Sequence, residues 1–346
     1  MRKDSADRFL QRVWYQDAGQ LVSLLLLPLS WLFAALVWLR RACFRAGVLR
    51  SHRFDVPVIV VGNVTVGGTG KTPFTIWLAR RLQERGLKVG IVLRGYGGTS
   101  REWPRHVTAQ SAWQEVGDEA VLLARSTSAL VIAGPDRVAD VRRAIELGAQ
   151  VVVSDDGLQH YRLQRQAEII VIDGERGIGN ARMLPAGPLR EPRTRIMEGD
   201  LQVVTRRVPA DAPLPAAFGT SMAVVALARI SYARSLSSGR ERPLSEFVGT
   251  AVHAIAAIGH PESFFSALRR RGLTIREHPY PDHAALARED LVFEDDAPVL
   301  MTEKDAVKCA GLVDERHWVV PLEVELSPAD TEVVSGLLDR VLGRAR

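Results

Sequence analysis

The stretch Val58-Ile-Val-Val-Gly-Asn-Val-Thr-Val-Gly-Gly-Thr-Gly-Lys-Thr72 decides the fold. It begins as a buried strand and enters a glycine-rich loop that ends in Gly70-Lys71-Thr72. In such a loop the glycines let backbone N–H groups turn toward a polyphosphate, the lysine reaches the β- and γ-phosphates, and the threonine hydroxyl ligates Mg²⁺. Pro73 suits the first turn of the following helix, where no N–H is needed. The segment therefore predicts binding of ATP or GTP.

The loop departs from the common pattern at one position. Thr65 stands six residues before the lysine, where a glycine is usual. The alternative is a glycine-rich turn that binds nothing, since glycine is favoured wherever φ must be positive. The strand, the Gly-Lys-Thr and the helix all stand where a phosphate-binding loop needs them, which favours the nucleotide. We expect nucleotide contacts from Thr65, Val66, Gly67, Gly68, Thr69, Gly70, Lys71 and Thr72.

Length and composition describe a globular chain with a small basic excess. Its 346 residues suffice for two domains, or for one large domain with an appendage. A hydrophobic content of 47% and a charged content of 25% exclude a largely disordered protein. The net charge of +5 favours an anionic partner, such as a phosphate, a phospholipid surface or a nucleic acid. Cys43 and Cys309 form neither a zinc pattern nor a disulfide framework, which predicts a reducing, cytoplasmic setting.

Residues 21–39 form a second unusual segment, because they are almost entirely apolar and carry no charge. A helix of about 20 apolar residues can cross a bilayer or lie embedded in one leaflet, and Pro28 can bend it. A buried core helix is the alternative; a signal peptide is disfavoured because no small-residue cleavage site follows. The aromatic residues that flank or interrupt the segment are Trp14, Tyr15, Trp31 and Trp38. The arginines that follow it, which we call the basic collar, are Arg40, Arg41, Arg45, Arg50 and Arg53. We expect a membrane-associated helix on an anionic surface.

Short apolar runs then alternate with helical patterns. This alternation is typical of βαβ units on a parallel sheet, so the fold class is α/β with a P-loop NTPase-like core. The expected strands are 57–62, 88–93, 130–133, 150–154, 168–173 and 201–205, and the expected helices are 72–85, 117–126 and 136–147.

A second, smaller α/β domain is expected toward the C-terminus. Its strands are expected at 252–258, 274–278, 297–301 and 317–323, and its helices at 261–272, 284–292, 305–311 and 327–344. The expected domains are the N-terminal helix with its collar at 1–50, the P-loop core at 51–205, an extended hairpin-like linker at 206–250 and the smaller domain at 251–346.

Two pairs of acidic residues are candidates for chemistry. Asp155 and Asp156 follow a hydrophobic strand, and an acid at such a strand end can hold Mg²⁺ opposite the loop threonine. A solvated Asp-Asp-Gly turn is the alternative. Asp118 and Glu119 begin an expected helix, where Asp118 can simply be a cap. From pattern alone, the histidines of the chain carry no assignable role.

Six ordered motifs carry a resemblance over nearly the whole chain. They are Thr65-Val-Gly-Gly-Thr-Gly-Lys-Thr-Pro73, Arg94-Gly-Tyr-Gly97, Val116-Gly-Asp-Glu119, Asp155-Asp-Gly-Leu-Gln-His160, Pro185-Ala-Gly-Pro-Leu-Arg-Glu-Pro192 and Met301-Thr-Glu-Lys-Asp-Ala-Val-Lys308. Together they resemble the tetraacyldisaccharide 4'-kinases, the lipid A 4'-kinase family of Gram-negative bacteria. Such an ordered set is far more specific than any single motif.

The resemblance implies transfer of the ATP γ-phosphoryl group, with Mg²⁺, to the 4'-hydroxyl of a tetraacylated glucosamine disaccharide 1-phosphate. The product would be lipid IV-A, and the site would face the cytoplasm at the inner membrane. We also expect a monomer with no nucleic acid partner. Its implied catalytic residues are Asp118 as base, Lys71, and His283 from the second domain, with His260 as the alternative partner of Asp118.

The same resemblance implies the binding residues. Implied metal residues are Thr72, Asp155, Asp156, Glu119 and Glu191, and further nucleotide, phosphate or lipid residues are Gln159, His160, Arg94 and Arg190. Two other functions stay open from the residues themselves. One is a kinase or NTPase for a soluble substrate that uses the apolar helix as an anchor, and the other is a membrane-tethered nucleotide switch.

Overall fold

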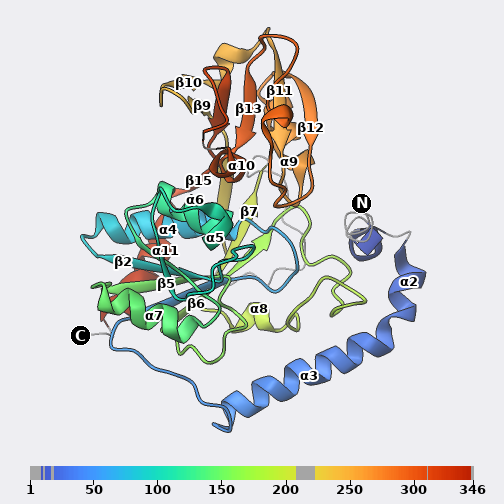
Figure 1. Ribbon diagram of the computed structural model, residues 1–346. Helices are drawn as coiled ribbons and strands as arrows, with labels where there is room; N and C mark the ends of the chain where they lie inside the picture. The colour runs from blue at the N-terminus through green and yellow to red at the C-terminus, as the bar shows by residue number, and fades with distance from the viewer. Residues whose placement is uncertain (1–8, 11, 17–18, 208–222, 310, 344–346) are drawn as a thin grey trace.

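The computed structural model of the protein describes residues 9–10, 12–16, 19–207, 223–309 and 311–343. Two β-sheets form two domains, one above the other, and a long N-terminal helix lies along one side of the lower domain (Figure 1). We call the lower, larger unit the core domain and the upper one the second domain. The expected α/β class, with a parallel-sheet core and a second α/β unit, is confirmed.

Within the described residues, the core domain holds a nine-stranded sheet in the order β15-β8-β7-β6-β1-β5-β2-β4-β3. The strands from β8 to β4 run parallel, and the edge strands β3 and β15 are antiparallel to their neighbours. The continuous Val and Ile runs suit the central strands because both faces of the sheet are covered. The strands are β1 (Val58–Gly62), β2 (Val89–Leu93), β3 (Arg105–Val107), β4 (Leu130–Ala133), β5 (Val151–Asp155), β6 (Ala167–Asp173), β7 (Leu201–Arg206), β8 (Ala223–Arg229) and β15 (Glu323–Leu326).

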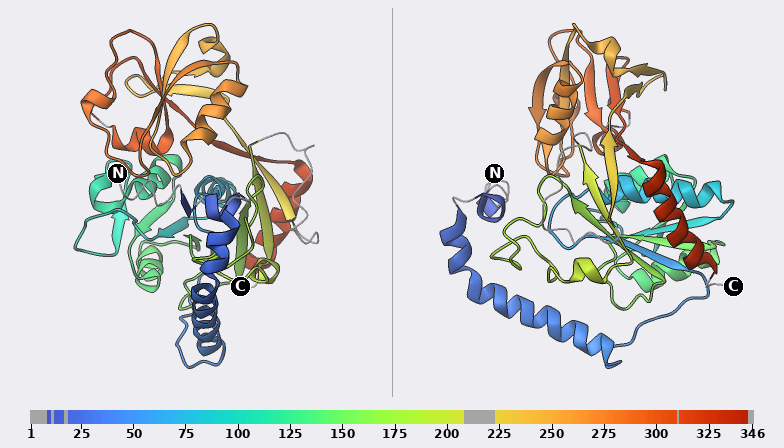
Figure 2. Two further views of the ribbon diagram at one scale, coloured as in Figure 1. Left: turned by 90° about the vertical axis from the view of Figure 1, so that its right-hand side faces the viewer. Right: turned by 180° about the vertical axis from the view of Figure 1, so that it is seen from behind.

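Helices cover both faces of this sheet. One face packs against α4, α6 and α11, whose apolar side chains join the main hydrophobic core, and Figure 2 shows α11 in red along the sheet. The opposite face packs against α7 and against residues 178–196, which include the start of α8. The helices are α4 (Lys71–Glu84), α5 (Trp113–Val116), α6 (Asp118–Ser126), α7 (Arg137–Glu146), α8 (Arg195–Glu198) and α11 (Pro328–Gly343).

The second domain is built on a six-stranded sheet, counted over the described residues, in the order β10-β9-β14-β13-β11-β12. It has an apolar core of its own, which includes Phe247, Phe265 and Leu268. Its elements are β9 (Tyr232–Ser235), β10 (Glu241–Pro243), η2 (Leu244–Phe247), β11 (Ala251–Ala256), α9 (Pro261–Arg270), β12 (Thr274–Pro279), η3 (Arg288–Asp290), β13 (Val299–Thr302), α10 (Glu303–Lys308) and β14 (His317–Val320).

The sheet topology differs from the expected domain boundaries in two places. β8 falls in the expected linker 206–250, yet it pairs with β7 in the core sheet. The expected strand 317–323 is two strands: β14 pairs in the second sheet and β15 pairs with β8 in the core sheet. The chain therefore crosses between the domains after β8 and again after β14. Pattern alone misses this because a short apolar run looks the same in either sheet.

The expected helix 284–292 is wrong. Within it the structure has only the 3₁₀ helix η3, and the Asp290 carboxylate accepts a hydrogen bond from the Ala287 N–H at 2.8 Å. The segment instead buries Leu286 and Leu291 in an apolar cluster beneath β13, so tertiary burial overrides the helical propensity. Residues 208–222, part of the expected linker, lie outside the described residues.

The N-terminal apolar segment forms two helices, α2 (Gln20–Leu25) and α3 (Leu27–Arg45). Pro28 lies in the first turn of α3, where proline is tolerated, so it starts a helix rather than bending one. Among the described residues, α3 is the one helix long and apolar enough to cross a membrane. Only 11% of the residues in its most apolar stretch are buried. The alternative of a buried core helix is therefore wrong.

α3 touches the core domain through polar side chains. Ser30 Oγ donates to the Met183 carbonyl at 2.8 Å, and Arg41 pairs with Glu198. The opposite side of the helix leaves large apolar side chains in the open, as listed here: Leu29, Trp31, Leu32, Leu36, Trp38 and Leu39. Trp14, in contrast, is buried and donates its indole N–H to the Pro185 carbonyl at 3.0 Å. The contiguous exposed stripe is typical of a surface that meets a membrane.

Removal of the buried ion pair between Arg137 and Asp140 on α7 tests what this pair contributes to the stability of the core domain. Its charged atoms are 3.3 Å apart and both side chains are buried. We expect Asp140→Ala to lower the free energy of unfolding by about 3 kcal/mol, because it leaves a buried guanidinium without its carboxylate. Denaturant unfolding followed by circular dichroism measures the change.

Asp339→Ala is the matched control. It removes an ion pair of 2.9 Å with Arg85, but the Asp339 side chain is 70% exposed. Such a surface pair contributes roughly 1 kcal/mol at most. Equal unfolding midpoints for the two variants would contradict the role given to the buried pair.

Candidate active site

The phosphate-binding loop runs from the end of β1 to Gly70, where α4 begins. Gly70 has a left-handed backbone with φ +80°, and a Cβ there would lie 2.9 Å from Thr205 Cγ2 on β7. The Thr205 hydroxyl donates to the Thr69 carbonyl at 2.8 Å. The loop is therefore held against β7 in a conformation that glycine alone adopts without strain. This leaves the N-terminus of α4 open to an anion.

Lys71 lies at the mouth of the loop. Its Nζ donates to Asn63 Oδ1 at 3.1 Å and is 3.6 Å from Asp156 Oδ1. Arg190 reaches the same two groups, through a hydrogen bond to Asn63 and one of 3.0 Å to Asp156. Two cations thus converge where a polyphosphate would enter. Asn63 is a site residue that the sequence analysis did not select.

Asp155 and Asp156 end β5 beside this loop and differ in their electrostatics. The carboxylate of Asp155 accepts hydrogen bonds from the hydroxyls of Thr72 at 3.1 Å and Thr75 at 3.3 Å. Burial, and then the charges of Glu119 and Asp156, raise the pKa of Asp155 to about 6, against the effect of Lys71. For Asp156, burial is outweighed by its cationic neighbours, which hold its pKa well below the usual range.

Asp118 is buried at the first position of α6 and faces the second domain. The N-cap of α6 is Gly117, and the Asp118 carboxylate accepts a hydrogen bond from the Glu119 N–H at 2.9 Å, so Asp118 also satisfies an N–H of the first turn. His283 Nδ1 lies 3.1 and 3.0 Å from the two carboxylate oxygens of Asp118. Burial alone would raise the pKa of Asp118, but the hydrogen bond from His283 and the charge of Lys304 outweigh it and lower that pKa. The acid and the imidazole come from different domains.

His260, the alternative partner of Asp118, lies elsewhere. Its Nε2 is 2.6 Å from Arg176 Nη1, and Arg176 also donates to the Gly68 carbonyl. Asp173 orients this guanidinium at 3.1 Å. The structure therefore brings His283 to Asp118 and connects His260 with the phosphate-binding loop through Arg176, a residue that no motif singled out.

The two glutamates expected at a metal each have a charged or hydrogen-bonded partner in the protein. Glu119 Oε1 is 3.5 Å from the ammonium of Lys304. Glu191 is buried, accepts a hydrogen bond from the Tyr161 hydroxyl at 2.8 Å and lies 3.9 Å from Arg41 of α3. The side chain of Glu191 therefore points to the N-terminal helix, whereas that of Glu119 points to the second domain.

Gln159 and His160 follow Asp156 at the carboxyl edge of the sheet. Burial and the nearby charge of Arg137 lower the pKa of His160 to about 4, so its imidazole is neutral near pH 7. Within the described part of the chain, the buried Nε2 of Gln159 has no hydrogen-bond partner. Arg94 is exposed at the end of β2 and contributes to the positive potential at His160. Free donors and arginines at this edge suit an anionic ligand.

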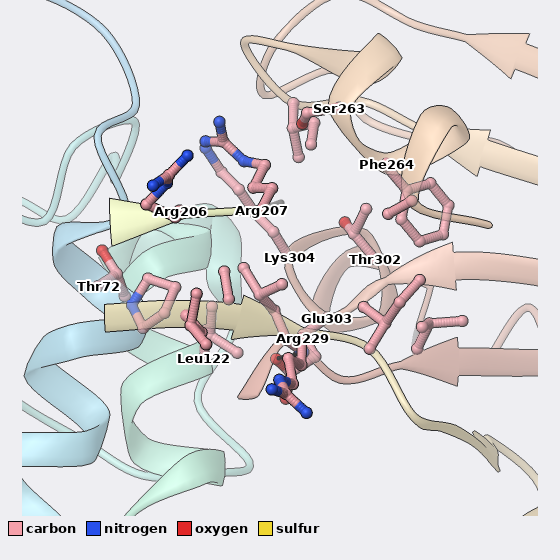
Figure 3. A pocket seen from close by; sticks show the side chains of 18 of the residues that line it. Thr72, Leu122, Arg206, Arg207, Arg229, Ser263, Phe264, Thr302, Glu303 and Lys304 are labelled. Atoms are coloured by element: carbon pink, nitrogen blue, oxygen red, sulfur yellow. Dashed lines mark hydrogen bonds between the residues drawn. The ribbon is translucent and has the colours of Figure 1, made fainter. Parts of the chain in front are cut away.

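A cavity of about 700 Å³ opens between the two domains beside α4 (Figure 3). Thr72 and Leu122 line it from the core domain, and Phe264 and Lys304 line it from the second domain. Its arginines are Arg206, Arg207, Arg229, Arg270 and Arg271. No local pattern predicts this cavity, because its walls come from segments far apart along the chain.

A parallel α/β sheet, a glycine-rich loop entering a helix, and an acid–imidazole pair beside that loop define a P-loop kinase. The profile of the family described as tetraacyldisaccharide-1-P 4'-kinase matches residues 22–342. The chain belongs to this family of ATP-dependent kinases of lipid A biosynthesis. The resemblance found in the sequence motifs is confirmed.

Relatives from several bacteria agree with this assignment. The chain is 48% identical to the tetraacyldisaccharide 4'-kinase of Alkalilimnicola ehrlichii, over 91% of this chain and 92% of that one. It is 44% identical to that of Methylobacillus flagellatus, over 98% of each chain. Its fold is similar to a crystal structure of LpxK from Aquifex aeolicus in complex with ATP, with a TM-score of 0.79, 29% identity, and coverage of 93% of this chain and 99% of that one.

The turn at Gly70 gives a direct test of the phosphate-binding loop. We expect Gly70→Ala to weaken ATP binding at least about tenfold, because the new Cβ meets Thr205 and the left-handed backbone is strained. Isothermal titration with ATP and Mg²⁺ measures the affinity.

Gly86→Ala separates backbone strain from the contact with β7. Gly86 ends α4 with a similar φ of +77°, and nothing lies within 4 Å of its ideal Cβ. ATP affinity should therefore stay within about twofold of the parent, although stability falls slightly. Equal loss of ATP binding in both variants would count against the role of the Gly70 turn.

Proposed function

We propose that the protein transfers the γ-phosphoryl group of ATP to the 4'-hydroxyl of a tetraacylated glucosamine disaccharide 1-phosphate, forming lipid IV-A. The observation that carries this proposal is the contact of 3.0 Å between Asp118 and His283 next to a phosphate-binding loop. Membership of the family supports a lipid disaccharide phosphate as substrate.

In the proposed reaction Asp118 is the general base. The sugar oxygen attacks the γ-phosphorus, a new O–P bond forms, the bond to the departing ADP oxygen breaks, and the hydroxyl proton passes to the Asp118 carboxylate. The lowered pKa keeps that carboxylate ionised, so a lone pair is free for the proton, and the developing bond to phosphorus makes the hydroxyl proton acidic enough to transfer. Most of the barrier reduction comes from alignment and from positive charge on the phosphoryl oxygens, which Lys71 and Arg190 supply.

The residues near the loop fit Mg²⁺. Asp155 accepts hydrogen bonds from two hydroxyl groups, and burial and then nearby negative charge raise its pKa. A hard cation bound there would offset that negative charge. Thr72, Asp155 and Asp156 would hold the ion, and Glu119 and Glu191 have the other contacts described above. Within the described ranges no three His, Cys, Asp or Glu side chains form a metal cluster, so phosphate oxygens would complete the coordination. When bound, Mg²⁺ neutralises charge on the β- and γ-phosphates.

The cavity between the domains fits the nucleoside of ATP. It begins at Thr72 and Pro73, next to the triphosphate position, and Leu122, Ile258 and Phe264 make its wall largely apolar. A purine ring is flat and apolar on its faces, so such walls suit it. The arginines at the rim would lie near the phosphates and ribose.

We further propose that α3 lies in the cytoplasmic leaflet of the inner membrane and does not cross it. Ser30 and Arg41 fasten the two halves of the helix to the core domain, so it runs along the protein rather than away from it. The exposed apolar stripe of α3 can then enter the leaflet while the basic collar meets anionic head groups. A monomer placed in this way reaches a substrate whose acyl chains stay in the bilayer, since each buried CH₂ contributes about 0.8 kcal/mol.

The decisive experiment supplies γ-labelled ATP, Mg²⁺ and the tetraacyl disaccharide 1-phosphate in mixed micelles. Label should enter the glycolipid at its 4' position. Label found only in free phosphate would favour a nucleotide switch and would contradict the proposal. Label found in a soluble acceptor from cytosol, and not in lipid, would favour a soluble substrate.

Asp118→Asn tests the base. The amide keeps the shape of the side chain and cannot accept the proton, so kcat in the labelled-ATP assay should fall about 10²- to 10⁴-fold. The affinity for ATP should stay within about twofold, because the base acts only as the hydroxyl attacks. Unchanged turnover would leave Asp118 with a structural role alone.

Asp156→Ala tests the metal set. We expect the Mg²⁺ concentration that gives half-maximal activity to rise about 10- to 100-fold. Titration of activity with Mg²⁺ measures this, and Asp339→Ala, on the far surface, should keep the parental titration. An Asp156→Ala curve that superimposes on the parental curve would exclude Asp156 from the metal site.

A further inference from the structure

The ammonium of Lys304 lies where the core domain and the second domain meet. Lys304 is on the first turn of α10, and its Nζ is 3.1 Å from His283 Nε2 and 3.2 Å from Asp282 Oδ1. On the core side it is 3.5 Å from Glu119 Oε1. Only 15% of the side chain is exposed. A single lysine therefore joins the loop that carries His283 to the helix that carries Asp118.

Hydrogen-bond chemistry allows one arrangement of protons in this chain of contacts. An ammonium has three donors and no acceptor, so the Nε2 of His283 must accept from Lys304. A neutral imidazole that accepts at Nε2 carries its proton at Nδ1. That N–H points at the carboxylate of Asp118, which lies 3.0 Å away. The opposite tautomer would place two donors face to face at Lys304 and leave two acceptors face to face at Asp118.

We propose that Lys304 is a positioning residue that fixes the tautomer of His283 and so directs its Nδ1–H at the catalytic carboxylate. The inference rests on the proposed function, and it deepens that function by naming the group that sets the acid–imidazole pair. Lys304 touches neither the reacting atoms nor the proton that is transferred.

The other contacts of His283 do not select its tautomer, so we assign that role to Lys304. His283 has a left-handed backbone, with φ +61°, and its ring packs 5.1 Å from that of Tyr96, contacts that place the ring without selecting a tautomer. The Asp282 carboxylate lies 3.7 Å from Nε2 and is itself paired with Lys304. Lys308, the other cation of α10, is bound to Asp305 at 2.8 Å. Among the described residues, Lys304 is the donor within hydrogen-bond distance of Nε2.

Lys304 also links the acid–imidazole pair to the contact between the two domains. Asp118 and Glu119 belong to the core domain, whereas Asp282, His283 and Lys304 belong to the second domain. The ammonium faces carboxylates from both, so its charge favours the arrangement in which the domains are together. The tautomer and the contact between domains are therefore set by one side chain.

The kinetic test compares Lys304→Met, which removes the donors, with Lys304→Arg, which keeps them. In the labelled-ATP assay we expect Lys304→Met to lower kcat about 10- to 100-fold, with a smaller change in the KM for ATP because Lys304 also lines the cavity between the domains. Lys304→Arg should recover kcat to within about fivefold of the parent. Lys88→Met is the control, because Lys88 is an exposed lysine bound to the Leu147 carbonyl, and it should leave kcat unchanged.

A double-mutant cycle separates positioning from general damage. In a His283→Ala background, Lys304→Met should change kcat by less than about twofold, since the ring through which it acts is gone. An equal loss of kcat with and without His283 would overturn the proposal. So would a Lys304→Arg variant that is as impaired as Lys304→Met while both melt within a few degrees of the parent.

A spectroscopic readout does not depend on turnover. Long-range ¹H–¹⁵N spectra of the full chain labelled at histidine, in micelles, distinguish a proton on Nδ1 from one on Nε2, and His283→Ala identifies the signals of His283. The parent should show Nδ1–H, and Lys304→Met should shift the ring toward Nε2–H. An unchanged tautomer would overturn the inference even if the glycolipid is phosphorylated. A shifted tautomer would support the inference even if no glycolipid accepts phosphate. That lack of phosphate transfer would contradict only the proposed function.

Discussion

The left-handed turn at Gly70 is the constraint on which the rest of the site depends. It ends a loop that the hydroxyl of Thr205 fastens to β7, and it is the N-cap of α4. Because β1 and β7 belong to one parallel sheet, the loop, the carboxylates that end β5 and the first turn of α6 all meet at the carboxyl edge of that sheet. A residue with a Cβ at this turn would displace the loop from β7, and with it the position of the triphosphate.

The chain completes the site by leaving the core sheet and returning to it. β8 leads into the second domain and β15 leads back, so α11 packs on the same face of the core sheet as α4. This path places His283 and Lys304 over α6, although more than 160 residues separate His283 from Asp118. The acid–imidazole pair is therefore an interdomain contact, and its geometry depends on how closely the domains approach. If a nucleotide binds between the domains as proposed, their approach would exclude water from the reacting phosphate.

The N-terminal helix α3 packs against a segment that also supplies residues to the phosphate-binding site. It is fastened to the segment 178–196, which also supplies Arg190 to Asp156 and Glu191 to Tyr161. The same segment thus contacts the apolar helix α3 on one side and the Lys71 and Asp156 site on the other. If α3 lies in a leaflet as proposed, a lipid at the surface of the bilayer would meet the catalytic residues without leaving that leaflet.

Local sequence determined the phosphate-binding loop, the strand and helix pattern of the core and the apolar helix, because glycine conformations and hydrophobic periodicity act over a few residues. The ordered motifs also identified the family. Only the tertiary structure decided that β8 and β15 belong to the core sheet, that His283 rather than His260 meets Asp118, and that Lys304 joins them. Each of these depends on contacts between distant segments, where burial and charge pairing outweigh local preference, and no spacing along the chain encodes such contacts.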